Sequence, residues 1–146
     1  MKVNINAFVP ESYITESEQR MIAYKKISAI SSEQDVQEVI NEFTTRLGKI
    51  PREVTNLIDI AYIKNLASNL KVTEVLCTNN QAHLLFEKRS HIMDNSALGN
   101  AIYKFNKNCS LDLGDAPKIK FISTGDNNLN YLLIRQFIEY ANGIKN

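Results

Sequence analysis

The chain has 146 residues, of which 44% are hydrophobic and 23% are charged, and its formal net charge is +1. This length and composition are typical of a globular domain with a buried core and exclude a disordered or fibrous chain. A net charge so close to zero excludes the strong overall attraction to nucleic acid or anionic lipid that very basic proteins show.

Two isolated cysteines and the lack of long apolar runs predict a cytoplasmic protein. Cys77 and Cys109 lie far apart and outside any Cys-x-x-Cys pair, as is usual in a reducing compartment. No apolar segment follows a basic start, as it would in a signal peptide. The longest purely aliphatic run, residues 132–134, is far too short to cross a bilayer, so no membrane anchor is expected.

The first half of the chain predicts one strand and three helices. Residues 3–7 alternate apolar and polar side chains, which is the period of a half-buried strand. Thr15 and Glu18 have the spacing of a capping box, so a helix is expected over about residues 16–30. The inward face of this helix is predicted to consist of Met21, Tyr24, Ile27 and Ile30.

The second helix has the clearest periodicity in the chain. Ser31 and Gln34 repeat the capping spacing at its start. Apolar residues then recur every three or four positions; they are Val36, Val39, Ile40, Phe43 and Leu47. Glu38, Glu42 and Thr45 fall on the opposite side of the helix, which predicts a solvated polar face.

A tight corner is predicted between the second and third helices. Gly48 supplies the left-handed conformation that ends a helix, and Pro51 suits the first turn of the next helix. Phe43 and Leu47 share one face of the incoming helix, and together with Arg46 they complete this structural corner. The apolar residues of the third helix cover more than one stripe, which predicts a helix buried on two sides.

The rest of the chain predicts two antiparallel strand pairs and two more helices. The third helix is expected to end near Leu70. The strands are expected at residues 72–77, 82–86, 110–113 and 118–122, and the later helices at residues 95–105 and 128–142. Asn79 and Asn80 tolerate the positive φ of a primed turn within the first strand pair. The last helix is predicted to bury Leu129, Leu133, Phe137 and Tyr140 and to end at Gly143.

These elements predict an α+β fold with the order β-ααα-ββ-α-ββ-α. Neighbouring strand pairs with short links imply an antiparallel sheet, against which the helices pack. No repeat, low-complexity segment or linker interrupts residues 1–146, so we expect a single domain.

Few residues in the sequence suit catalysis. The chain has no glycine-rich phosphate loop, no Gly-x-Ser-x-Gly elbow and no His-Glu-x-x-His motif. His83, His91 and the two thiols are widely separated, so a metal site would need distant parts of the chain. Asp59 lies among apolar residues of the third helix, either as a perturbed site carboxylate or as an acid with local partners. We expect no catalytic residue, metal or cofactor.

Short basic clusters leave two other classes of function open. The clusters are Lys25 with Lys26, Lys88 with Arg89, and Lys118 with Lys120. Pairs of this size usually form solvated faces, and nucleic-acid surfaces add more charge, exposed aromatic rings or a known module. A nucleic-acid-binding module is the alternative, and it requires these lysines to converge in the fold. A small enzyme requires a pocket with converging titratable groups.

Three stretches, in order and at the right spacing, resemble one known domain. They are residues 8–14 with 20–27, residues 42–51 at the helical corner, and residues 57–61 with 66–67. The resemblance is to the C-terminal domain of the bacterial transcription-repair coupling factor. It covers the whole chain, although residues after Val72 match by pattern more than by motif.

The resemblance implies a regulatory piece of a larger machine. The parent is an ATP-dependent DNA translocase that removes stalled RNA polymerase at lesions and recruits nucleotide excision repair. Its motor, which uses ATP and magnesium, is absent from this chain, so the fragment itself is expected to be non-catalytic. In the family, this domain docks on an N-terminal module that resembles part of the excision-repair helicase. Docking masks the binding site for the damage-recognition ATPase, without direct contact to DNA or membrane.

The resemblance also implies which residues make the docking contact. The family uses acidic residues of the second helix, just before the corner, against arginines of the N-terminal module. Glu42 matches the first of these acids, whereas Thr45 stands where the second acid is expected. Glu38 shares their face of the helix. We therefore expect partner binding through Glu42, Thr45 and Glu38, by a weaker or rearranged contact.

Overall fold

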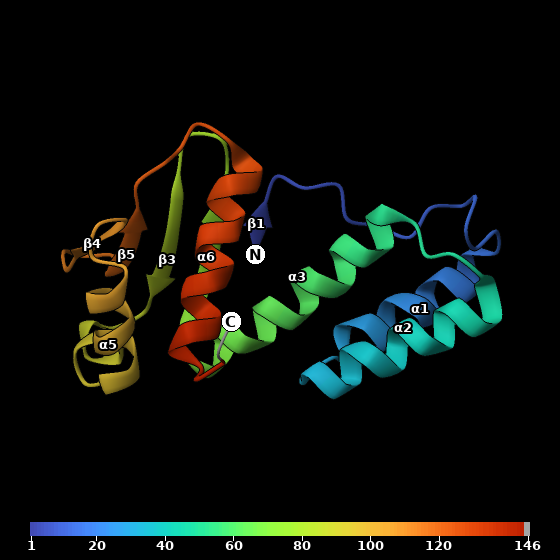
Figure 1. The fold of residues 1–146 in the computed structure, drawn as a ribbon, viewed down its shortest axis with the longest axis horizontal. Helices are drawn as coiled ribbons and strands as arrows, with labels where there is room; N and C mark the ends of the chain where they lie inside the picture. Colours follow the sequence, from blue (N-terminus) through green and yellow to red (C-terminus); the bar gives the residue numbers. More distant parts are fainter. Residues whose placement is uncertain (145–146) are drawn as a thin grey trace. The chain divides into compact units, whose positions relative to one another are not determined.

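The structure, a computed structural model, describes residues 1–144 and divides the chain into two compact units (Figure 1). Residues 5–65 form one unit, called the helical unit below. Residues 1–4 and those from Leu66 onward form the other, called the sheet unit. No linker-like composition marks this division, because the boundary falls inside helix α3 (Arg52–Asn69). The single domain expected for residues 1–146 stays a prediction.

The first helix of the helical unit is α1 (Ser17–Ser28), and the way it starts differs from the prediction. Its N-cap is Glu16, which makes no side-chain capping hydrogen bond, so the capping box of Thr15 and Glu18 is wrong. Arg20 instead fixes the segment that precedes α1, because its Nη1 donates to the carbonyl oxygens of Ile14 and Thr15 at 3.0 and 2.7 Å.

The buried face of α1 is only half as predicted. Ile27 and Ile30 are buried, but Met21 is 60% exposed and Tyr24 is 39% exposed, with its hydroxyl accepting a hydrogen bond from a backbone amide. Ala23 takes the inward position instead. Residues 21–24 are all apolar or aromatic, so the sequence of this run does not show which side of the helix is buried.

Helix α2 (Glu33–Leu47) has nearly the predicted bounds. Its capping signature lies one residue later than expected, since the Ser32 hydroxyl accepts from the Asp35 amide at 3.1 Å. Phe43 is buried as predicted, whereas Leu47 is 36% exposed, so its inward orientation is wrong. Leu47 is the last residue of the helix, where few neighbours remain to cover it.

The corner after α2 contains Gly48 and Pro51, but Gly48 does not have the predicted left-handed helical conformation. Gly48 has φ +80° and ψ −147°, so the positive φ is confirmed. That ψ lies outside the left-handed helical region, in a region that is essentially restricted to glycine. The Pro51 carbonyl accepts from the amides of Val54 and Thr55 and thus starts α3. The two-sided burial of α3 is also confirmed; its buried residues are Val54, Ile58, Tyr62, Ile63, Leu66 and Ala67.

The sheet unit contains a five-stranded sheet in the order β1-β2-β3-β5-β4. The strands are β1 (Lys2–Val3), β2 (Val72–Cys77), β3 (Ala82–Phe86), β4 (Cys109–Asp112) and β5 (Lys118–Phe121). All neighbours are antiparallel except β1 and β2, which are parallel. The predicted α+β fold is confirmed, with a first strand shorter than expected. None of the helices within residues 1–144 is long and apolar enough to span a membrane.

Within residues 1–144, three helices accompany the sheet, one more than predicted. They are α4 (Arg89–Met93), α5 (Ser96–Lys104) and α6 (Asn127–Ala141). Helix α4, which contains His91, is not among the predicted helices, because its five residues are too few for an apolar period to stand out. Asn95 caps α5, because its side-chain oxygen accepts from the Leu98 amide at 3.2 Å. Helix α6 lies against β2, β3 and β5 (Figure 1).

The turn between β2 and β3 is not the primed turn that Asn79 and Asn80 suggested. Within residues 1–144, Lys71 is the only non-glycine residue with positive φ. The Thr78 hydroxyl closes the turn instead, because it accepts from the amides of Asn80 and Gln81 at 3.3 and 3.1 Å. A side-chain oxygen thus replaces the left-handed backbone that the primed turn requires.

The buried face of α6 is rotated relative to the prediction. Phe137 is buried, but Leu129 is 53% exposed and Tyr140 is 39% exposed. The buried positions include Asn127, Asn130, Ile134, Ile138 and Ala141. Because two of the buried residues are asparagines, the hydrophobicity pattern of the sequence does not identify the buried face of α6. Gly143 follows the helix with φ +81°, as its predicted role as a stop requires.

Candidate protein-interaction surface

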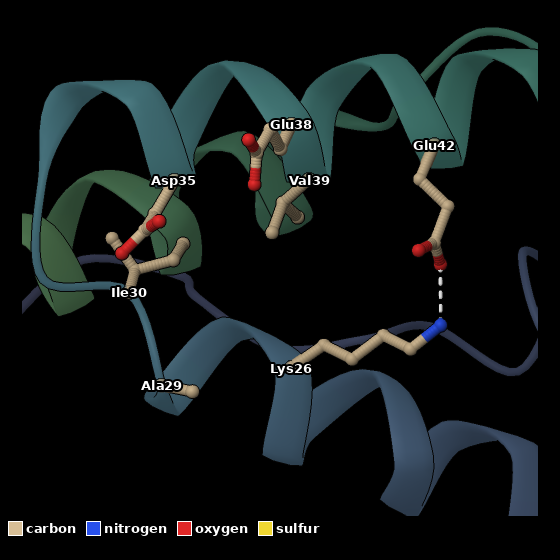
Figure 2. A pocket seen from close by; sticks show the side chains of 7 residues that line it. All are labelled: Lys26, Ala29, Ile30, Asp35, Glu38, Val39 and Glu42. Atoms are coloured by element: carbon tan, nitrogen blue, oxygen red, sulfur yellow. Dashed lines mark hydrogen bonds and ion pairs between the residues drawn. The ribbon is translucent and has the colours of Figure 1, made fainter.

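A hollow of about 280 Å³ lies between α1 and α2 in the helical unit (Figure 2). Its apolar lining is Ala29, Ile30 and Val39. Its charged lining is Lys26 from α1 and three carboxylates from α2: Asp35, Glu38 and Glu42. We call this surface the acidic hollow, because its negative groups outnumber its positive one.

The spacing of the three acids explains why they share the hollow. Asp35, Glu38 and Glu42 are three and four positions apart, so one side of α2 carries all of them. In Figure 2 their side chains hang from α2 toward α1. Glu38 and Thr45 are exposed, as predicted, while α1 covers Glu42 to the point where its side chain is 37% exposed. Thr45 is not among the residues that line the hollow.

Glu42 is held in place by two cations. Its Oε2 accepts from Lys26 Nζ at 2.5 Å and from Arg46 Nη1 at 3.2 Å. The hydrogen bond from Lys26 lowers the pKa of Glu42, and the positive charges of Lys26 and Arg46 add to this effect. Glu42 is therefore a fixed carboxylate anion at neutral pH.

The other two acids are held by residues of their own helix end. Asp35 accepts from the Ser31 amide and hydroxyl, both at 3.0 Å, and these hydrogen bonds lower the pKa of Asp35. Glu38 accepts from Gln34 Nε2 at 3.2 Å. Within residues 1–144 neither of these two carboxylates makes an ion pair, and Lys26 is the only cation among the residues that line the hollow. Arg46, which is outside the lining, also pairs with Glu42.

Only one of the two ion pairs of Glu42 could be predicted from the sequence. Arg46, predicted as a corner residue, follows Glu42 by four residues, and this spacing favours an ion pair within a helix. Lys26 was assigned to a basic cluster on α1, and its contact with Glu42 joins two helices. A contact between helices has no periodic signal, so the sequence does not predict it.

The remaining corner residues form an aromatic contact and a turn. The ring of Phe43 meets the ring of Tyr13 edge to face, with centroids 6.5 Å apart. Gly48 and Pro51 form the backbone turn described above, and Leu47 stands beside them partly exposed. None of these residues lines the acidic hollow.

The other residues weighed for chemistry are dispersed. Cys77 and Cys109 are both buried and free, and burial raises the pKa of Cys77 to about 11, which makes its thiol unreactive. Asp59 is half-buried and has an interaction partner, which favours an acid satisfied by its surroundings. Within residues 1–144, no group of three or more His, Cys, Asp or Glu residues could hold a metal ion.

Comparisons with known proteins all point to the same family. A sequence model of the family described as TRCF domain matches residues 3–96. The transcription-repair-coupling factor of Borreliella burgdorferi is 32% identical over 75 residues, which cover 51% of this chain and 7% of that protein. The factor of Rickettsia prowazekii is 28% identical over 94 residues, which cover 64% of this chain and 8% of that protein. The chain thus matches only a small part of these relatives' length.

A solved structure has the same fold. It is the crystal structure of the C-terminal domain of transcription-repair coupling factor, with a TM-score of 0.80 and 20% sequence identity. The match covers 97% of this chain and 89% of that one. Since the family match spans well over half of the residues and the fold agrees throughout, the chain belongs to the TRCF domain family, that of the C-terminal domain of the transcription-repair coupling factor.

Proposed function

We propose that this chain is a non-catalytic regulatory domain of a transcription-repair coupling factor. It docks on the N-terminal repair-helicase-like module of that factor and masks the module's site for the excision-repair damage-recognition ATPase, called the repair ATPase below. The parent removes stalled RNA polymerase at lesions, and its motor, not this domain, uses ATP and magnesium. The observation that carries the proposal is the acidic hollow, with three carboxylates around Lys26.

The geometry of Glu42 suits an incoming arginine. Both of its cationic partners contact Oε2, and among residues 1–144 no hydrogen bond is made to its Oε1. A guanidinium from outside therefore has an acceptor oxygen on a carboxylate that is already oriented. Charge-assisted hydrogen bonds are the stronger kind, and an oriented acceptor loses little conformational entropy on binding.

Reversing the charge of Glu42 is expected to weaken docking at least about tenfold, because like charges brought together at an interface are costly. The measurement is calorimetric titration of the separately purified N-terminal module with this chain. Glu18→Arg is the matched control, since Glu18 is exposed on α1 and outside the hollow. Lys26→Met should strengthen docking, because it removes the only cation that lines the hollow, while Arg46 still orients Glu42.

The folded state should tolerate these changes. Lys26 and Glu42 are 38% and 37% exposed, and pairs this accessible contribute about 1 kcal/mol or less. Equal losses of affinity for Glu42→Arg and Glu18→Arg would show that docking depends only on the net charge of the chain. The acidic hollow would then not be the docking surface.

Thr45→Asp tests the acid that this chain lacks. Thr45 is exposed on the same helix, so an aspartate there costs little in folding. If an arginine of the N-terminal module stands opposite, the new pair should tighten binding by about threefold or more, within the range of interface charge pairs. Unchanged affinity for Thr45→Asp would mean that no cation lies within reach of this position.

The nucleic-acid alternative loses part of its basic surface in the fold. Lys26 is paired with Glu42, and Lys120 is paired with Asp112 at 3.3 Å. Phosphate binding requires cations that are free to replace counterions. Docking of a protein partner is therefore the better supported function.

A further inference from the structure

Helix α6 exposes a stripe of uncharged residues on the side opposite to the one that packs on the sheet. Spacings of three and four residues place the members of this stripe on one side of the helix. They are Leu129, Leu132, Leu133, Gln136 and Tyr140. Leu129 is 53% exposed and Leu132 is 46% exposed. We call these five residues the outer stripe of α6, since the inward side of the helix is buried.

The outer stripe is unusual because no charge accompanies its apolar side chains. Arg135 and Glu139 are the only charged residues of α6, and they pair with each other at 2.8 Å on one flank of the stripe. A helix that is apolar on opposite sides is normally buried on both of them, whereas the outer stripe stays exposed in the described part of the chain. The surface that covers it should therefore be apolar and uncharged along its centre.

The two ends of the outer stripe carry opposite charges. Asp126, the N-cap of α6, lies one turn before Leu129 and is exposed. Its Oδ1 caps the helix, and among residues 1–144 no hydrogen bond reaches its Oδ2. At the other end, Lys104 Nζ lies 5.2 Å from the centre of the Tyr140 ring. Neither Asp126 nor Lys104 makes an ion pair within the described residues, so each charge is available to an opposite charge on a partner.

A second copy of the same stripe satisfies all of these conditions when the two helices run antiparallel. Matching the stripes then sets Leu129 of each copy opposite Tyr140 of the other. Asp126 of each copy lies one turn beyond Leu129, where Lys104 of the other copy stands over Tyr140. The contact is two-fold symmetric, so each pairing of opposite charges occurs twice.

We propose that two copies of this chain associate through their α6 helices, which pair antiparallel along the outer stripe with Asp126 of each copy beside Lys104 of the other. Helix α6 has 15 residues, which corresponds to a helix about 22 Å long and about 10 Å wide. One pair of such helices buries less than the roughly 1,200 Å² that stable interfaces need. The dimer is therefore weak and reversible. It lies in the sheet unit and does not depend on the acidic hollow.

The test is sedimentation equilibrium of the 146-residue chain between about 10 μM and 1 mM, the range of weak association. We expect the average mass to rise toward that of a dimer with concentration. Leu132→Glu should raise the dissociation constant at least about tenfold, because it places a carboxylate in an apolar contact. Ile122→Glu is the matched control, since Ile122 is 64% exposed in the same unit but lies outside α6 and adds the same charge.

A charge exchange tests the antiparallel arrangement. Lys104→Glu sets two carboxylates together at each end of the dimer, and Asp126→Lys sets two ammonium groups together there. Each variant alone should dimerise at least about fivefold more weakly than wild type. Mixed in equal amounts, the two variants should recover most of the wild-type affinity, because every end contact again joins opposite charges. Circular dichroism of each variant checks its fold, since Asp126→Lys also removes the N-cap of α6.

Asp126→Asn provides a second variant at the same position, because asparagine also caps helices. It removes the charge without a repulsive contact, so it should weaken the dimer, but less than Asp126→Lys does. The proposal is overturned if the wild-type chain stays monomeric up to about 1 mM, or if Leu132→Glu and Ile122→Glu change the dissociation constant alike. It is also overturned if the mixed charge variants associate no more tightly than either variant alone.

Discussion

Replacing Gly48 with alanine is expected to lower the free energy of unfolding by about 1–3 kcal/mol, the cost of one residue held in a sparsely populated backbone region. Gly48 has φ +80° and ψ −147°. A Cβ at this position would meet no atom within 4 Å, so the whole cost is conformational and not a clash. The corner between α2 and α3 can form only with that backbone geometry, which is why glycine stands there.

The matched control is Gly99→Ala, measured in the same urea denaturation series. Gly99 lies inside α5, and a Cβ there would also meet nothing within 4 Å. It lacks the positive φ of Gly48, so alanine should stabilise the helix by about 0.5–1 kcal/mol. Opposite signs for the two variants are the expected result; an equal stabilisation by both would remove the conformational role assigned to Gly48.

Asn130→Ala is expected to destabilise the sheet unit by about 2–4 kcal/mol, because it leaves several inward polar groups without partners. Asn130 is fully buried. Its Nδ2 donates to the Thr78 carbonyl at 2.8 Å, and its Oδ1 accepts from the Thr124 amide and hydroxyl, both at 2.9 Å. One side chain therefore ties α6 to the β2–β3 turn and to the loop after β5.

Asn128→Ala is the control for this variant, because Asn128 is an exposed neighbour on the same helix. It should change the unfolding free energy by about 0.5 kcal/mol or less. Asn130→Asp is a second variant, with a side chain of the same shape. Its carboxylate would face the Thr78 carbonyl oxygen without a donated hydrogen bond, and this repulsion should also lower the free energy of unfolding. If both Asn130 variants unfold at the urea midpoint of wild type, the buried network contributes nothing measurable.

The elements with strong periodic patterns were predictable from the sequence. Helix α2 and strands β2 and β3 lie within a residue or two of their expected bounds. The faces of α1 and α6 were not, since Met21 and Leu129 are exposed while Ala23 and Asn130 are buried. Hydrophobicity alone does not reveal a small or polar residue that is buried because it fits or is hydrogen-bonded.

Only the part of the candidate site on α2 was predictable from the sequence. Glu38 and Glu42 share one side of α2, as the spacing indicates. The sequence did not show that Lys26 closes on Glu42 from α1, because that contact arises from the packing of two helices. It matters for the proposed function, because an arginine that docks there would share Glu42 with Lys26 and Arg46.

The most direct test of the central claim is competition for the N-terminal repair-helicase-like module. Binding of the repair ATPase to that module is measured alone and with a saturating concentration of this chain. Masking predicts that the chain lowers the apparent affinity of the ATPase at least about tenfold, and that Glu42→Arg at the same concentration restores most of it. If the ATPase binds the module equally well with the wild-type chain bound, the chain docks without masking and the proposed function is wrong.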